Sequence, residues 1–298
     1  MPYFFLAISV LSGVTKGFCG KRVSAYTSEF KSAAFSNLIR MLMCVVIGFL
    51  FVLFDGGIDE LVPNSTFVLV SLLSGVATAA FVVFWLFAIR RGAYILVDVF
   101  LTLGTLLSAT LSVVFYGAEF TLFDVVGFSL LVVASLIMCY YSVQIKHGIS
   151  ISAIAFLLLS ATANGISDFS KEIFNRELGS LYSASVFNFY TFVFAALVLL
   201  LVFLFSKASD ESSENIRYLK RRGLVYIALM SVFLFMNSFF KTLASEKLDM
   251  TIVSPLSQGA ALVLVSVMSA IFFGEKIKPR CAVGLAFAIT GLLVINFL

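Results

Sequence analysis

The sequence predicts an all-α integral membrane protein with ten transmembrane helices, arranged as two inverted five-helix repeats. Three observations support this fold class. The composition is strongly apolar, the apolar residues fall into runs of about 20, the length that crosses a bilayer, and residues of the first half recur in the second half in the same order.

The composition excludes most soluble folds. Apolar residues make up 61% of the chain and charged residues only 12%, with a mean hydropathy of +1.09, whereas a soluble domain needs a charged surface. A transmembrane β-barrel alternates polar and apolar residues along short strands, and the long runs here do not. Because the backbone in lipid must satisfy its own hydrogen bonds, these runs should be helices.

The apolar runs give the expected spans, and short breaks that carry charge, Gly or Pro separate them. The ten spans are residues 2–20, 31–54, 66–89, 93–116, 121–141, 150–169, 182–206, 223–244, 249–273 and 280–298. The long hydrophilic stretch, residues 207–222, is expected to be a linker between helices 7 and 8. No segment is expected to form a soluble domain.

An internal repeat divides the chain into residues 1–145 and 146–298. For example, Phe115-Tyr116-Gly117 recurs as Phe272-Phe273-Gly274. The offset in residue number between matching helices changes only at loops. Each half contains five predicted helices, an odd number. The second half should therefore enter the membrane from the opposite side, as an inverted repeat.

The basic residues predict the orientation in the cell membrane. Loops on the side away from the N-terminus hold fourteen of them: Lys21, Arg22, Lys31, Arg90, Arg91, Lys146, Lys207, Arg217, Lys220, Arg221, Arg222, Lys276, Lys278 and Arg280. Loops on the N-terminal side hold three: Lys171, Arg176 and Lys247. The positive-inside rule therefore predicts that both termini lie outside the cytoplasm. The net charge of +4 comes from basic residues in these short loops, so it indicates no nucleic-acid partner.

One motif near the C-terminus carries a family resemblance. Phe272-Phe273-Gly274-Glu275 is followed by a short basic turn with Pro279 and then by Gly284 and Gly291. Together with the ten-helix pattern, this resembles the drug/metabolite transporter superfamily in its EamA-like branch. The resemblance implies a substrate cavity between the halves, lined mainly by helices 1–4 and 6–9, with helices 5 and 10 at the periphery. It also implies transport of a solute by alternating access.

Polar residues within the spans are the candidate site, because an ionisable side chain in hydrocarbon is costly and usually functional. The expected substrate cavity is formed by Asn37, Trp85, Asn164, Asn188, Asn237 and Gln258. The expected gating ion pairs come from Lys16, Arg40, Asp98, Asp168 and Lys241. Lys16 and Lys241 could instead extend to the membrane interface, Trp85 could belong to an interfacial aromatic belt, and the ion pairs could simply join helices.

The favoured function is a secondary transporter of a small organic metabolite, anionic or zwitterionic, such as an amino acid. This charge preference follows from three cations against two carboxylates in the expected cavity. The alternatives are an exporter of drugs or amphiphiles, a non-transporting membrane scaffold, or a polyprenyl-lipid enzyme. The sequence has no Cys/His metal set, Gly-rich phosphate loop or Ser/His pair, so no enzyme activity, metal or cofactor is expected.

The expected partners are membrane lipid and a small-molecule substrate. Helix 10 also carries a row of small residues, Gly284, Ala288 and Gly291, which would allow close contact between helices. A homodimer through helices 5 and 10 is therefore a further hypothesis, with contacts inside one chain as the competing explanation.

Overall fold

The computed structural model covers the chain with gaps. It describes residues 1–297 except 25, 28, 56, 92–93, 120, 143–150, 208, 220–222 and 274–278. Within the described backbone, side chains are not described at 89–91, 94–99, 138–142, 151, 269, 273, 280–281 and 296–297.

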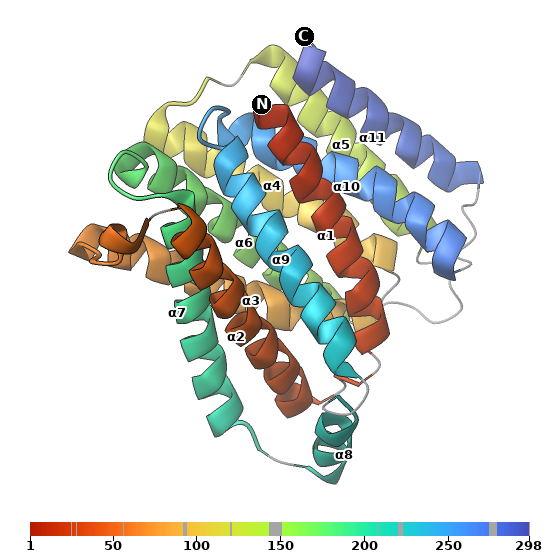
Figure 1. Ribbon diagram of the computed structural model, residues 1–298. Coiled ribbons are helices and arrows are strands. Elements are labelled where there is room, and N and C mark those ends of the chain that lie inside the picture. The colour runs from red at the N-terminus through yellow and green to blue at the C-terminus, as the bar shows by residue number, and fades with distance from the viewer. Residues whose placement is uncertain are drawn as a thin grey trace.

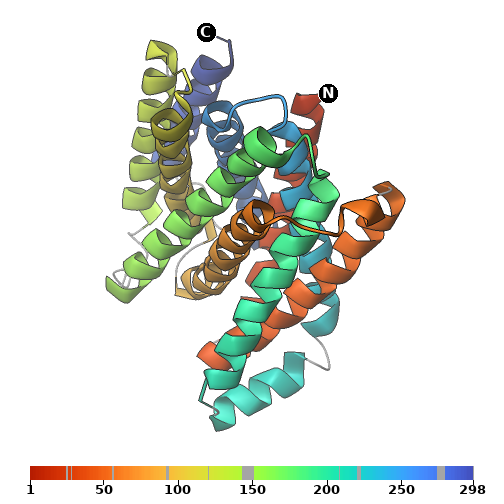
Figure 2. The ribbon, with the colours of Figure 1, turned by 90° about the vertical axis from the view of Figure 1, so that its left-hand side faces the viewer.

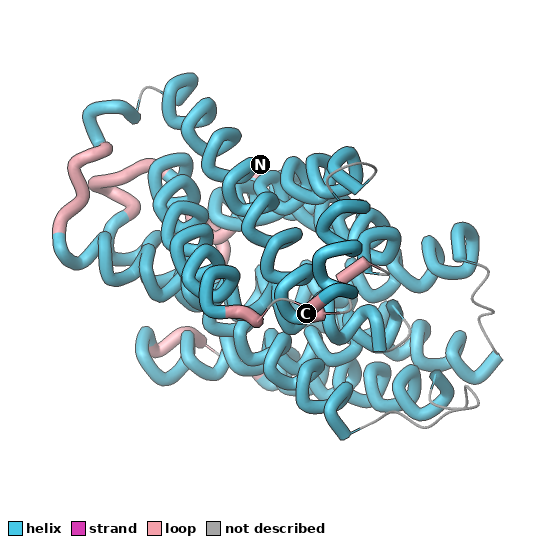
Figure 3. The backbone as a smooth tube through the Cα atoms, turned by 90° about the horizontal axis from the view of Figure 1, so that it is seen from below, coloured by secondary structure: helices cyan, strands magenta, loops and turns pink. Residues whose placement is uncertain are grey.

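The described elements are helices joined by turns and loops (Figure 3). The first half holds α1 (Pro2–Ser24), α2 (Phe30–Asp55), the short η1 (Gly57–Glu60), α3 (Ser65–Arg91), α4 (Tyr94–Tyr116) and α5 (Leu122–Ser142). The second half holds α6 (Ile151–Ile173), the π-helical η2 (Phe174–Leu178), α7 (Ala184–Phe205), α8 (Asp210–Tyr218), α9 (Leu224–Ala244), α10 (Met250–Phe273) and α11 (Pro279–Phe297). The ten expected spans correspond to all of the α-helices except α8.

Three segments differ from those expected. Helices α1 and α6 each run four residues past their expected ends, at residues 20 and 169. Lys171 and Glu172 lie in the buried last turn of α6. The hydrophilic linker contains α8, whose N-terminus is capped because Ser209 and Ser212 exchange side chain–backbone hydrogen bonds of 2.9 and 3.0 Å. The two helix extensions and α8 are rich in charged and polar residues, so the hydropathy pattern missed them.

Seven of the described helices are long and apolar enough to cross a membrane: α1, α2, α3, α6 continued through η2, α7, α9 and α10. Shorter apolar stretches lie at Phe100–Tyr116, Leu122–Ile137 and Ala282–Ile295, within α4, α5 and α11. Large apolar side chains are exposed along the outer faces, for example Leu69, Leu204 and Phe205, the last at 85%. Exposure of this kind suits contact with lipid rather than with water.

Both termini lie at one end of the bundle, which we call the terminal side (Figure 1). Helix α8 lies at the other end, the opposite side. The most extensive helix contacts join α1 to α9, α5 to α11, α3 to α6, and α2 to α7, while α4 packs on α6 and α10. Each of these contacts joins a helix of the first half to one of the second.

Helices α5 and α11 form a pair at one edge of the bundle (Figure 2) and otherwise pack chiefly on α4 and α10. A Cβ atom added to Gly291 would lie 2.8 Å from the Gly127 carbonyl oxygen, so these backbones touch. Ala288 is also fully buried. The small residues that suggested a dimer thus mediate contact within the chain, and a homodimer through these helices would have to use their other faces.

Candidate functional site

A polar cavity of about 80 Å³ lies in the centre of the bundle, between α1, α3, α6, α9 and α10, with contributions from α4 and α7. Its described charged lining is Lys16, Asp168, Lys171 and Lys241. Its described amide and hydroxyl lining is Thr78, Asn164, Ser167, Asn237, Ser238, Ser257 and Gln258. Phe81, Trp85 and Phe192 supply aromatic surface. A cavity this polar within an apolar bundle is suited to a polar solute.

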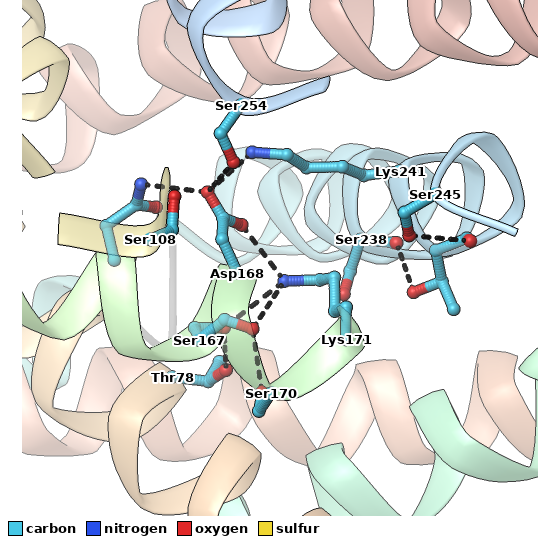
Figure 4. A network of polar contacts seen from close by, with 12 residues as sticks. Thr78, Ser108, Ser167, Asp168, Ser170, Lys171, Ser238, Lys241, Ser245 and Ser254 are labelled. Carbon is cyan, nitrogen blue, oxygen red and sulfur yellow. Dashed lines mark hydrogen bonds and ion pairs between the residues drawn. The ribbon is translucent and has the colours of Figure 1, made fainter. Parts of the chain in front are cut away.

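The Asp168 carboxylate is the centre of an ionic cluster near the C-terminal end of α6, which we place toward the terminal side. Figure 4 shows the cluster from close by. Lys241 Nζ lies 2.6 Å from Oδ2, and Lys171 Nζ lies 3.3 Å from Oδ1. The Ser254 hydroxyl and the Asn164 amide donate to Oδ2 over 3.3 and 3.4 Å. Asp168 is 2% exposed, so charge-assisted contacts replace the water that it loses on burial.

Helix periodicity explains how α6 presents this cluster. Asn164, Asp168 and Lys171 follow one another at spacings of four and three, which places them on one face of a helix. Ser167, beside them, makes a 3.2 Å hydrogen bond with the Thr78 hydroxyl of α3. This bond fixes the rotation of α6 against the helix on which it packs most closely.

Two cations and an indole form a second charged group. Lys16 Nζ lies 5.4 Å from the centre of the Trp85 ring and 5.2 Å from that of Phe81, and Arg40 Cζ lies 5.9 Å from the Trp85 ring. These are cation–π distances. A Cβ atom on Gly20 would lie only 2.3 Å from Trp85 Cη2, so the absence of a side chain at Gly20 gives the indole its place.

Arg40 is fully buried outside the cavity lining. Its Nη1 donates to the Asn37 side-chain oxygen over 2.7 Å, and the Asn37 amide donates to the Val82 carbonyl of α3 over 3.2 Å. Its Nε and Nη2 have no hydrogen-bond acceptor among the described residues. The side chain of Asp98, the expected partner of Arg40 or Lys16, lies outside the described residues.

Asn188 and Asn237 have different positions around α9. The Asn188 amide donates to Ala184 O over 2.8 Å and to Thr242 Oγ1 over 3.2 Å, away from the cavity. Asn237 lines the cavity, and its amide donates to Ser9 O over 2.8 Å. Asn188 therefore joins α7 to α9, and Asn237 joins α9 to α1.

The structure brings together most of the residues expected to form the site. Those that line the cavity are Lys16, Trp85, Asn164, Asp168, Asn237, Lys241 and Gln258. Asn37, Arg40 and Asn188 lie outside its described lining. Sequence reasoning placed Lys171 in a loop, whereas the structure buries it in the cavity wall. Its spacing of three from Asp168 was the available signal.

A further polar network lies at the terminal side of the cluster. The buried Glu172 accepts a 2.7 Å hydrogen bond from Ser112 of α4 and pairs with Arg176 at 3.0 Å. Arg176 also pairs with Asp249, between α9 and α10, at 2.7 Å. The Asn175 amide donates to Thr242 O over 3.0 Å. These contacts join α4, η2, α9 and the segment that leads into α10.

Among the described residues, no group of three or more His, Cys, Asp or Glu side chains is arranged to hold a metal ion. Asp168 is bonded to amines, an amide and a hydroxyl instead. The chemistry of the described site is therefore that of charge pairing and hydrogen bonding.

Comparisons with known proteins agree with this geometry. A model of the EamA-like transporter family matches residues 150–297. Among solved structures 28 chains match; one, a crystal structure of a protein 16% identical to this chain, covers 97% of this chain and 96% of its own, with a TM-score of 0.63. At that identity the likeness shows the fold alone. No curated protein matches. The chain belongs to the EamA-like transporter family, whose members are membrane transporters of the drug/metabolite kind.

Proposed function

We propose that this protein is a secondary transporter that moves a small anionic or zwitterionic metabolite across the cell membrane by alternating access between two inverted five-helix repeats. The observation that carries this proposal is the polar cavity within the bundle, which helices of both halves line with three lysines and one described carboxylate. Neither a scaffold nor a surface-acting lipid enzyme needs buried charges around a central space. An exporter of amphiphiles would be better served by a mainly apolar lining.

The helix contacts support an inverted repeat with α4, α5 and α11 also crossing the membrane. Exchanging the halves, helix for helix, turns the α1–α9 contact into α6–α3, and the α3–α7 contact into α9–α2. It turns α4–α6 into α10–α1 and leaves α2–α7, α4–α10 and α5–α11 unchanged. Every one of these contacts is present, as a twofold relation in the membrane plane requires.

The Asp168–Lys241 pair is the proposed outer gate. The positive-inside bias assigns the terminal side to the cell exterior, and the pair lies toward that side of the cavity. The cavity volume of about 80 Å³ is below the ~300–1,000 Å³ of sites that hold drug-sized ligands. The structure therefore suits a contracted state with the outer gate closed. At the inner gate, Asp98 would pair with Arg40 or Lys16 when the cytoplasmic side closes.

Transport by the purified protein tests this function. Proteoliposomes are loaded with an isotope-labelled metabolite extract, and the solutes released are identified by mass spectrometry against protein-free liposomes. We expect release of at least one small organic anion or zwitterion. The rate should fall for Asp168→Asn and for Lys241→Met alone and recover in part for the double variant. If no solute is released faster than from protein-free liposomes, the protein is not such a transporter; wild-type rates in all three variants would refute the gate.

A further inference from the structure

The terminal-side end of the cavity holds more buried positive charge than its described residues balance. Lys171 is 5% exposed and Lys241 is 8% exposed, and both contact the single carboxylate of Asp168. Asp168 is the one carboxylate among the described residues that line the cavity. Two ammonium groups thus share one negative charge, away from water.

The two lysines differ in what they hold together. Lys241 reaches from α9 to Asp168 on α6 through one short 2.6 Å contact, so it joins two helices. Among the described residues, the polar contacts of Lys171 all lie on its own helix: Ser167 O at 3.1 Å, Ser167 Oγ at 3.3 Å and Asp168 Oδ1 at 3.3 Å. Its ammonium folds back along α6 and contacts no second helix in the part of the chain that the structure describes.

A purely structural role therefore explains Lys241 but not Lys171. Burial of an ammonium group is unfavourable unless close partners replace its water, and the three contacts of Lys171 are long for charged hydrogen bonds. A group of this kind, in the wall of a cavity, is suited to binding an anion that enters the cavity.

We propose that Lys171 binds the carboxylate of the solute and that the site selects small monocarboxylates over zwitterions and amines. This inference rests on the proposed transport function and narrows its substrate class. An entering carboxylate would bring the cluster to two positive and two negative charges. The ammonium of a zwitterion would meet lysines but no unshared carboxylate among the described lining residues. The nearby amides of Asn164 and Gln258 can serve the neutral polar groups of the solute.

The chain contains a built-in reporter for this test. Trp85 is its only tryptophan, and its indole lines the same cavity. The fluorescence of the full chain in lipid nanodiscs is titrated with propanoate, alanine and alaninamide, which share one carbon skeleton and differ in charge. We expect propanoate to bind at least about tenfold more tightly than the other two, because a charged hydrogen bond lost or gained changes affinity by roughly that factor or more.

Variants identify the residue responsible. Lys171→Met should weaken propanoate binding by about tenfold or more, and Lys171→Arg should retain most of it. The control is Lys247→Met, which removes an exposed positive charge on the same side of the membrane and should leave binding unchanged. The ranking of the three solutes by the wild-type protein needs no variant, so it decides even where a substitution prevents folding.

Three outcomes would overturn the proposal: alanine or alaninamide binding as tightly as propanoate, propanoate affinity unchanged in folded Lys171→Met, or no response of Trp85 to any of the three. Preference for alanine together with metabolite release from proteoliposomes would remove the carboxylate site and leave the transporter. Lys171-dependent propanoate binding without release of any solute would leave the site and remove transport.

Discussion

We expect Lys241→Met to destabilise the wild-type protein but to stabilise the Asp168→Asn variant. Removal of one partner from a buried ion pair costs about 3–5 kcal/mol, because the other charge stays buried without it. Lys241→Met leaves Asp168 bonded to Lys171, Ser254 and Asn164, so we expect a loss near 3 kcal/mol, at the lower end of that range. Asp168→Asn leaves two buried ammonium groups without their carboxylate, so we expect about 5 kcal/mol.

The double variant separates a shared charge cluster from independent contacts. Adding Lys241→Met to Asp168→Asn removes one of the two unpaired ammonium groups. The double variant should therefore be more stable than Asp168→Asn alone, although Lys241→Met destabilises the wild-type protein. Removing Lys171 as well, by Lys171→Met, should stabilise the protein further for the same reason.

Unfolding of the purified variants in one detergent, followed by far-ultraviolet circular dichroism, measures these differences. Lys247→Met is the matched control, because it removes an exposed lysine, and we expect a change within about 0.5 kcal/mol. If Lys241→Met destabilises the wild type and the Asp168→Asn background by the same amount, the two residues are not coupled, and the pair is not the buried contact described.

Two more predictions concern the aromatic wall and the topology. Gly20→Ala places a Cβ atom where Trp85 now lies, 2.3 Å from Cη2, so we expect a loss of about 1–3 kcal/mol and a shifted emission spectrum; unchanged emission would contradict the position of the indole. The positive-inside bias predicts an extracytoplasmic C-terminus, so a C-terminal alkaline phosphatase fusion should be active and a C-terminal green fluorescent protein dark, whereas the reverse result would invert the assignment.

Much of the fold could be predicted because the bilayer constrains the sequence strongly. Long apolar runs must be helices, and charges within those runs are costly enough to mark a site. For this reason Asp168, Lys241 and Lys16 could be singled out from the sequence, and all three line the cavity. The pattern also placed Trp85 and Gln258 in an expected cavity that the structure contains.

The direction in which a neutral amide faces could not be predicted in the same way. Asn37 and Asn188 occupy matching positions in the repeat that the sequence predicts, and both donate to neighbouring helices rather than to the cavity. An amide in lipid can be satisfied by any nearby carbonyl or hydroxyl, and only helix packing decides which one is near. Lys171 was missed because it lies near the end of an apolar run, where a charged residue usually marks the start of a loop. Only its contact with Asp168 shows that it lies in the cavity wall.

The helices around the cavity form two groups that could move against each other in the proposed transport cycle. Helix α6 packs mainly on α3 and α4, and α9 mainly on α1 and α2. Polar contacts reinforce each group, since Thr78 joins α3 to α6 and Asn237 joins α9 to α1. The Asp168–Lys241 pair crosses between the two groups. Each group contains helices from both halves of the chain.

If the outer side opens as proposed, the two helix groups would move apart as units. This motion would separate Asp168 from Lys241. If separation costs about 3–5 kcal/mol, the open form of the empty protein is populated at roughly one part in a hundred to one in several thousand, since each 1.4 kcal/mol is about a factor of ten. A carboxylate bound beside Lys171 would lower that cost, because it would place a second negative charge in the cluster where Asp168 now serves both lysines. A solute anion would thereby favour the motion that carries it.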